Sequence, residues 1–170
     1  PSLSYGGAET MLTFVADSCA KVFEKVEILS FSNKRNVYNF DSKIKIHYLN
    51  LEKVEQKRSI VSKIALRLKT IKLLRQEIKK IKPDLICSFG SYYVLFTFFS
   101  TVGLGVKIVG SERRSPKNLP IKWKLISRYI YSKCDGMVFQ LKNAKDFFGY
   151  KVREKSVVIP NPYLSNKKYE

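Results

Sequence analysis

The residues best suited to chemistry follow a short apolar segment in the second half of the chain. Ser111, Glu112 and Arg113 come directly after residues 106–110, which have the composition of a buried strand. If that strand belongs to a parallel sheet, the three side chains lie at its carboxyl end, where such sheets bind ligands. The planar fork of arginine suits a carboxylate or a phosphate. A ligand site and an internal ion pair between Glu112 and a neighbouring arginine are both compatible with this pattern.

A second candidate is the glycine pair Gly6 and Gly7, where a loop leads into an expected helix. Glycine leaves the first amides of the helix unobstructed, and those amides attract phosphate together with the helix dipole. The pair lacks the third glycine of the dinucleotide signature, which argues against a nucleotide-dependent dehydrogenase, and no phosphate-binding lysine follows it. A tight turn before an ordinary helix is the simpler interpretation.

Several other kinds of active site find no support in the residue types. The sole histidine, His47, alternates along an expected strand and is predicted to be structural, so a Ser-His triad is not expected. Cys19, Cys87 and Cys134 are far apart and follow no metal-ligand spacing. We therefore predict reduced, buried thiols in a cytoplasmic protein, and no metal site.

The elements that must position these residues alternate between strands and helices. Apolar residues spaced three and four apart predict helices, and short apolar or alternating runs predict strands. The expected helices are 8–23, 55–81, 92–101, 122–134 and 144–148, and the expected strands are 26–31, 44–49, 84–89, 106–110, 136–140 and 156–159. This alternation implies right-handed crossovers and helices on both faces of a mainly parallel sheet. The predicted fold class is α/β, doubly wound and Rossmann-like.

The charge of the chain indicates an anionic partner. Lys and Arg total 32 against 14 Asp and Glu, which gives a net charge of +18 over 170 residues. Nucleic acid, membrane surfaces and phosphorylated ligands are the usual partners of such a protein. Nearly half of the excess lies in residues 51–82. There is no apolar run long enough to span a bilayer, and the first residues are turn-like rather than typical of a signal peptide.

The long helix expected at 55–81 has two faces that the sequence distinguishes. One stripe is apolar and is predicted to face the core: Ile60, Ile64, Leu68, Ile71, Leu74, Ile78 and Ile81. Leucines also occur among lysines roughly opposite that stripe, and a peripheral contact with the inner face of the cytoplasmic membrane is one hypothesis for them. The residues of this hypothetical contact are Lys63, Leu66, Lys69, Leu73 and Lys80. A solvated lysine face with two stray leucines is the alternative.

A basic nucleic-acid-binding α/β domain without enzymatic activity is the rival interpretation. Its support is the net charge together with the aromatic residues in 92–99, which could stack on bases. Those aromatics form a continuous apolar stretch that is typical of a core helix, and no recognised nucleic-acid motif is present. Nucleic acid is therefore the less favoured partner.

Several segments occur together in an order that resembles a known family. They are Gly6-Gly7-Ala8-Glu9, residues 82–89, Gly110-Ser111-Glu112-Arg113 followed by Ser115-Pro116, residues 134–140, and residues 157–162 with Pro160-Asn161-Pro162. Together they resemble the N-terminal, acceptor-side domain of the retaining glycosyltransferases of family 4, which have the two-domain GT-B fold. The resemblance covers nearly all of the chain.

The resemblance implies a function and a division of labour. This domain would help to bind a sugar or lipid-linked saccharide acceptor, and an absent C-terminal domain would hold the nucleotide-sugar donor. The implied cleft residues are Gly6, Gly7, Ser111, Glu112 and Arg113. Ser111, Glu112 and Arg113 stand where many relatives have a histidine, so no catalytic residue is assigned.

The resemblance also implies boundaries. Residues 1–160 would form one Rossmann-like domain whose first strand is missing, and residues 161–170 would begin the linker to the donor domain. No cofactor is expected in this domain. The full-length enzyme would be a hexosyltransferase of cell-envelope polysaccharide or glycan biosynthesis, and we predict that the isolated 170-residue chain transfers no sugar.

Overall fold

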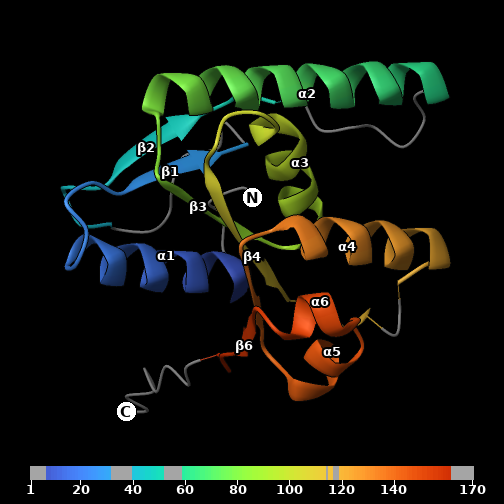
Figure 1. The fold of residues 1–170 in the computed structure, drawn as a ribbon. Helices are drawn as coiled ribbons and strands as arrows, with labels where there is room; N and C mark the ends of the chain where they lie inside the picture. Colours follow the sequence, from blue (N-terminus) through green and yellow to red (C-terminus); the bar gives the residue numbers. More distant parts are fainter. Residues whose placement is uncertain (1–6, 32–39, 52–58, 114, 117–118, 162–170) are drawn as a thin grey trace, which may run out of the picture. The chain divides into compact units, whose positions relative to one another are not determined.

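The computed structural model describes residues 7–31, 40–51, 59–113, 115–116 and 119–161 (Figure 1). The chain divides into two compact units. Unit 1 comprises Pro1–Asp84 and Phe96–Val106, and unit 2 comprises Leu85–Leu95 and Lys107–Glu170.

Unit 1 contains a parallel pair of strands, β1 (Glu27–Ser30) and β2 (Lys45–Tyr48), with Leu29 opposite His47. Helix α1 (Gly7–Ala20) supplies Ala16 to a small core with Ile28 and Ile44. Partly buried apolar residues complete this core: Leu12, Ala20, Val26, Phe40 and Ile46. Successive side chains of a strand point to opposite faces, and Ile28 is the residue of β1 that is buried in this core.

Helix α2 (Ile60–Ile81) begins at Ser59, whose hydroxyl accepts the amide of Ser62 at 3.2 Å, a standard N-terminal cap. It ends where Lys82 adopts a left-handed conformation with φ +52° just before a proline. The part of the predicted helix from 55 to 58 lies outside the described residues. The buried residues of α2 are Leu66, Thr70, Leu74 and Ile78.

The predicted core stripe of this helix is therefore wrong at its N-terminal end. Ile60, Ile64 and Leu68 are exposed by 77%, 51% and 61%, whereas Leu66 is only 8% exposed. The physical reason is charge. The buried residues Leu66, Thr70, Leu74 and Ile78 form a row at four-residue spacing that carries no charge, whereas Arg67 and Arg75 lie within the predicted stripe. Burying an unpaired guanidinium would cost more than exposing a few apolar side chains.

Helix α3 (Ser91–Thr101) begins in unit 2 and ends in unit 1. In unit 1, Arg75 of α2 donates to the carbonyls of Ser100 at 3.0 Å and Val102 at 2.8 Å, which satisfies the end of α3. Phe96 is 1% exposed and its ring lies 6.1 Å from that of Phe31. Phe96 is therefore a core residue and cannot stack on a nucleic-acid base.

Unit 2 contains a four-stranded parallel sheet in the order β3-β4-β5-β6. Its strands are β3 (Leu85–Phe89), β4 (Lys107–Glu112), β5 (Gly136–Phe139) and β6 (Ser156–Val158). Its helices are α4 (Ile121–Lys133), α5 (Lys142–Asp146) and α6 (Tyr150–Arg153). The rings of Tyr131 and Phe139 lie 5.1 and 5.2 Å from that of Phe148, so an aromatic cluster fills this core.

Close packing at β4 explains a glycine in the middle of that strand. A Cβ added at Gly110 would lie 2.7 Å from Met137 Sδ and 3.1 Å from Val94 Cγ2. Met137 and Val94 are themselves fully buried, so neither neighbour has free space to retreat into. Gly110 therefore lets the side chains on this face of the sheet pack closely.

The segment that joins α4 to β5 has a structural role as well. The carboxylate of Asp135 accepts the amide of Ile108 at 2.7 Å, and the amide of Asp135 donates to the carbonyl of Ile108 at 2.9 Å. Lys155 donates to the carbonyls of Ser132 and Cys134 at the end of α4. These bonds fix the start of β5 beside β4.

The predicted α/β class with parallel strands flanked by helices is confirmed. The described strands form two sheets, however, because β1 pairs only with β2 and β3 only with β4 among the described residues. Cys87 is exposed, so the prediction of a buried thiol is wrong there; Cys134 is buried, and burial raises the pKa of its thiol to about 11. None of the described helices is long and apolar enough to cross a membrane.

Candidate functional site

The carboxyl edge of the unit 2 sheet brings together polar residues from several strands. Ser111 pairs with Val138, Glu112 pairs with Phe139, and Phe139 in turn pairs with Val158. The residues that follow these strands therefore meet at one edge, which is where parallel sheets bind ligands. The turn into α3 joins the same edge, because the amide of Gly90, at φ +92°, donates to the carbonyl of Ser111 at 2.7 Å.

Glu112 lies inside unit 2 although it belongs to this edge. It is 1% exposed, and its Oε1 accepts the backbone amide of Arg113 at 2.9 Å. Its Oε2 accepts the hydroxyl of Tyr131, which is also buried. Burial and the neighbouring carboxylate raise the pKa of Tyr131, so this hydroxyl remains a neutral donor. The Glu112 carboxylate therefore fixes the backbone from which Arg113 projects.

The guanidinium of Arg113 lies against two side-chain amides. Its Nη2 donates to Asn161 Oδ1 at 2.7 Å. With the amide of Gln140 turned so that its oxygen faces the guanidinium, that oxygen lies 3.0 Å from Arg113 Nε and 2.7 Å from Nη2. A guanidinium stays protonated in proteins, so Arg113 carries a positive charge at this edge. The edge thus presents an oriented cation, which suits a phosphate or carboxylate ligand.

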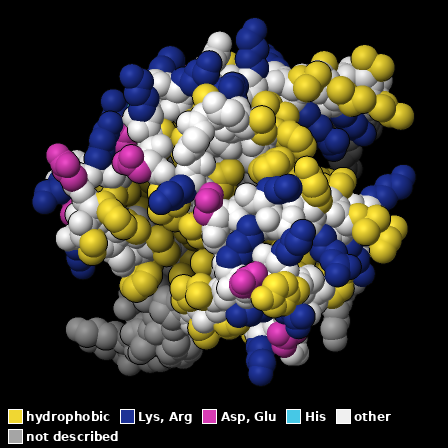
Figure 2. Space-filling view, viewed as in Figure 1, with side chains coloured by type: hydrophobic (Ala, Val, Ile, Leu, Met, Phe, Trp, Pro, Cys, Tyr) yellow, Lys and Arg dark blue, Asp and Glu magenta, His cyan; other side chains and the backbone are white. Residues whose placement is uncertain are grey.

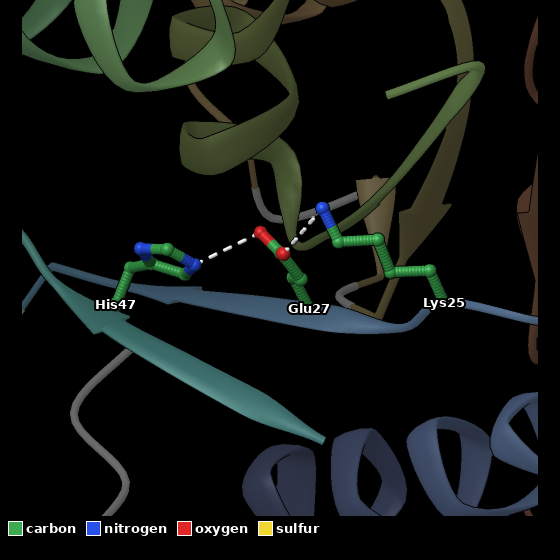
Figure 3. Close-up of polar contacts among 3 residues, drawn as sticks. All are labelled: Lys25, Glu27 and His47. Carbon is green, nitrogen blue, oxygen red and sulfur yellow. Dashed lines mark hydrogen bonds and ion pairs between the residues drawn. The ribbon is translucent and has the colours of Figure 1, made fainter. Parts of the chain in front are cut away.

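Unit 1 contains a separate polar cluster (Figure 3). The carboxylate of Glu27 in β1 lies 2.9 Å from Lys25 Nζ through one oxygen and 2.9 Å from His47 Nε2 through the other. Burial alone would raise the pKa of Glu27, but the hydrogen bonds and positive charges of Lys25 and His47 outweigh it and lower the pKa. The structural role predicted for His47 fits this pairing.

A shallow cavity of about 210 Å³ lies beside that cluster and is formed by β2 and α2. Its lining residues are His47, Tyr48, Leu49, Leu73 and Glu77. Leu73 is therefore half-buried against β2. Together with the burial of Leu66, this shows that the predicted membrane-contact face of Lys63, Leu66, Lys69, Leu73 and Lys80 is wrong, because its two apolar residues face the protein.

Comparison with known proteins gives a structural likeness. No protein-family model matches the chain, and no curated protein matches it. The crystal structure of Anabaena Alr3699/HepE in complex with UDP and glucose matches 95% of this chain with a TM-score of 0.63 and 12% sequence identity. The likeness shows the fold. This chain spans 43% of the length of that protein.

A second solved structure is less similar. The S. aureus MnaA-UDP co-structure matches 78% of this chain with a TM-score of 0.48 and 19% identity, and this chain again covers 43% of it. We draw no argument from this weaker match. The parallel α/β fold of the chain is supported by the likeness to HepE.

The sequence-predicted residues fall in different places. Ser111, Glu112 and Arg113 lie together in unit 2, with Glu112 turned inward. Gly7 is the first residue of α1 in unit 1, and Gly6 lies outside the described residues. The described residues contain no group of three or more His, Cys, Asp or Glu side chains that could hold a metal ion.

Arg113, Gln140 and Asn161 form a cluster at the carboxyl edge of the unit 2 sheet, which we call the edge cluster. Sequence reasoning missed Gln140 and Asn161. Gln140 is the last residue of the expected strand 136–140, so its position at the edge was foreseeable, but its contact with Arg113 was not. Asn161, between two prolines, indicated a domain boundary, yet its side chain accepts from Arg113 across 48 positions of the chain. The signal available was that each residue follows a strand of the same parallel sheet.

Proposed function

We propose that this chain is the acceptor-side part of a glycosyltransferase that uses a nucleotide-sugar donor. The observation that carries the proposal is the likeness to HepE over 95% of the chain, since that protein was solved with UDP and glucose. The sequence motifs that resemble the retaining GT-B enzymes of family 4 support it independently. In this proposal a separate donor domain binds the nucleotide, and the chain itself needs no cofactor.

The edge cluster supports the proposal chemically. Arg113 presents a positive charge at the carboxyl edge of a parallel sheet and is oriented by Gln140 and Asn161. In sugar transfer a nucleoside diphosphate leaves with developing negative charge, and an oriented guanidinium stabilises such charge. We propose that Arg113 binds an anionic group of the donor or the acceptor, while Ser111 contributes a hydroxyl nearby.

We assign buried Glu112 a positioning role rather than one in the cleft. Its carboxylate faces Tyr131 and the amide of Arg113. It therefore acts on a ligand through Arg113. The proposed acceptor is a free or membrane-linked saccharide, handled in the cytoplasm during cell-envelope polysaccharide or glycan synthesis, and the transferred sugar is a hexose.

The test is donor turnover by the natural protein that contains this sequence. Release of nucleoside diphosphate would be measured with UDP- and GDP-hexoses, with and without saccharide acceptors. We expect Arg113→Ala to lower kcat/KM by about 10- to 100-fold, because a charge-assisted contact is lost. The control Arg128→Ala removes an exposed arginine from α4 and is expected to leave kcat/KM unchanged.

Two results would overturn this proposal. One is the absence of nucleoside diphosphate release with every donor from a protein that unfolds cooperatively. The other is an equal loss of kcat/KM in Arg113→Ala and Arg128→Ala, which would place Arg113 outside the reaction. The isolated chain serves as a further comparison, because we predict that it lacks transferase activity without a donor domain.

A further inference from the structure

The N-terminal half of α2 exposes a set of large apolar side chains. Their exposed fractions are 77% for Ile60, 77% for Val61, 51% for Ile64 and 61% for Leu68. At about 3.6 residues per turn these four positions fall within an arc of roughly 100° on one side of the helix. They therefore form one contiguous strip, which we call the α2 strip. Hydrophobic side chains gather over this part of α2 in Figure 2.

The position of α2 in unit 1 explains why the α2 strip is exposed. Leu73 and Glu77 line a cavity together with residues of β2, so this later part of the helix is the part that lies over the strand. Ile60 precedes Leu73 by about 20 Å along the helix axis. The N-terminal half of α2 consequently extends beyond the end of β2, as Figure 1 shows.

Positive charge surrounds the α2 strip. Arg67 and Lys72 fall at the two edges of the arc, with Lys69 farther round the helix, and all three side chains are exposed. No acidic residue occurs from Ile60 to Gln76. No ion pair joins these three cations to any other residue that the structure describes. The strip therefore combines exposed apolar groups with uncompensated cations.

We propose that the α2 strip binds the surface of an anionic lipid bilayer. An interfacial helix buries its apolar arc at the level of the headgroups while the basic residues at its edges pair with anionic lipids. The anionic headgroups surrounding an inserted helix complement the cations on both edges of the strip. This inference does not depend on the proposed transferase activity, because it rests only on the surface of α2.

Other occupants fit the strip less well. A stable protein interface requires about 20 residues on each side, whereas the strip offers four apolar side chains. Nucleic acid would pair with the cations, but it would place phosphates against isoleucine and leucine without burying them. A lipid surface would bury the apolar side chains and also pair with the cations.

Helix α4 in unit 2 provides a matched control. It also exposes apolar residues at four-residue spacing, Ile121 by 68%, Leu125 by 60% and Tyr129 by 60%. Two of its four cations, however, lie over aromatic rings. Lys124 Nζ is 5.5 Å from the ring centre of Phe147, and Lys133 Nζ is 5.8 Å from that of Tyr129. We therefore expect α4 to contribute less to binding of anionic lipid.

The experiment is vesicle flotation with the full-length natural protein. Vesicles of phosphatidylcholine would be compared with vesicles that also contain phosphatidylglycerol, and we expect binding only to the latter. The triple variant Ile60→Ser, Ile64→Ser and Leu68→Ser is expected to weaken this binding at least about tenfold. The control variant Ile121→Ser, Leu125→Ser and Tyr129→Ser is expected to bind within about twofold of the natural protein. All six side chains are exposed, so both variants should keep their circular dichroism spectra.

A charge variant tests the other half of the proposal. Replacing Arg67, Lys69 and Lys72 by glutamine is expected to weaken binding by about fivefold for each charge. Salt should weaken binding of the natural protein and affect the glutamine variant less. Equal binding to neutral vesicles would overturn the proposal, as would an equal loss in the α2 and α4 serine variants. Full binding by the α2 serine variant would also overturn it, because charge alone would then suffice.

Discussion

Each unit contains a carboxylate that points inward from a strand, and the two are partnered in different ways. Glu112 of unit 2 accepts the hydroxyl of Tyr131 and the backbone amide of Arg113. Glu27 of unit 1 is paired with the cationic Lys25 and with His47. The two carboxylates therefore have different roles. Glu112 fixes the geometry of a ligand-binding edge, whereas Glu27 links the stability of its unit to pH.

The largest expected effect comes from removing the buried carboxylate of unit 2. Glu112→Ala leaves the Tyr131 hydroxyl and the Arg113 amide without this acceptor and opens a cavity, so we expect a loss of about 3 kcal/mol in the free energy of unfolding. Urea unfolding of the purified protein measures this value. The control Glu154→Ala removes an exposed carboxylate and should change stability by less than about 0.5 kcal/mol. A loss below about 1 kcal/mol for Glu112→Ala would show that this carboxylate does not organise the edge.

A smaller change isolates the hydroxyl that pairs with Glu112. Tyr131→Phe keeps the ring that packs at 5.1 Å from Phe148 but removes the donor to the carboxylate. When this is the sole substitution, we expect the free energy of unfolding to fall by about 1.5 kcal/mol. In the Glu112→Ala background the same substitution should cost less than about 0.5 kcal/mol, because its partner is already gone. Equal losses in the two backgrounds would mean that the two side chains act independently.

The same comparison separates what the sequence predicts from what it does not. Both carboxylates lie on strands that the sequence predicts. The predicted ends of these strands, from alternating patterns or apolar runs, agree with the observed ends within one or two residues. The predicted strand 106–110 ends at Gly110, however, whereas β4 continues through Glu112. A buried glutamate at the end of a strand needs hydrogen-bond donors, and one of them, the hydroxyl of Tyr131, lies 19 positions later in the chain. Local pattern cannot reveal such a distant partner.

Helix α2 shows a second limit of local pattern. Its sequence contains two apolar rows, one through Ile60, Ile64 and Leu68 and another through Leu66, Leu74 and Ile78. Periodicity correctly predicts an amphipathic helix, but it does not decide which row faces the sheet. Tertiary packing decides it: Leu66, Leu74 and Ile78 are buried, while Arg75 donates to backbone carbonyls at the end of α3. The membrane contact predicted from the helical pattern alone therefore included Leu66 and Leu73, which tertiary packing turns toward the protein.

The smallest expected effect concerns the unit 1 carboxylate and its dependence on pH. The pKa of Glu27 is lowered from its usual 4.5, because Lys25 and His47 outweigh the effect of burial. The stabilisation by ionised Glu27 is therefore complete above about pH 5 and is lost as the pH falls through the lowered pKa. We expect Glu27→Gln to be less stable than the natural protein at pH 7 by less than about 1 kcal/mol, since Lys25 is largely exposed.

This difference should shrink as the pH falls below 4.5, the usual pKa of the group. Urea unfolding at pH 7 and at about pH 3 would measure it, with Glu24→Gln as the control, because Glu24 is exposed. A difference that stays constant between the two pH values would show that the charge of Glu27 is not what stabilises the cluster.

Glu112→Gln measured in the same series would complete the comparison. We expect its cost at pH 7 to exceed that of Glu27→Gln, because an amide in this buried position offers its NH₂ group to the hydroxyl or to the backbone amide, where an acceptor is needed.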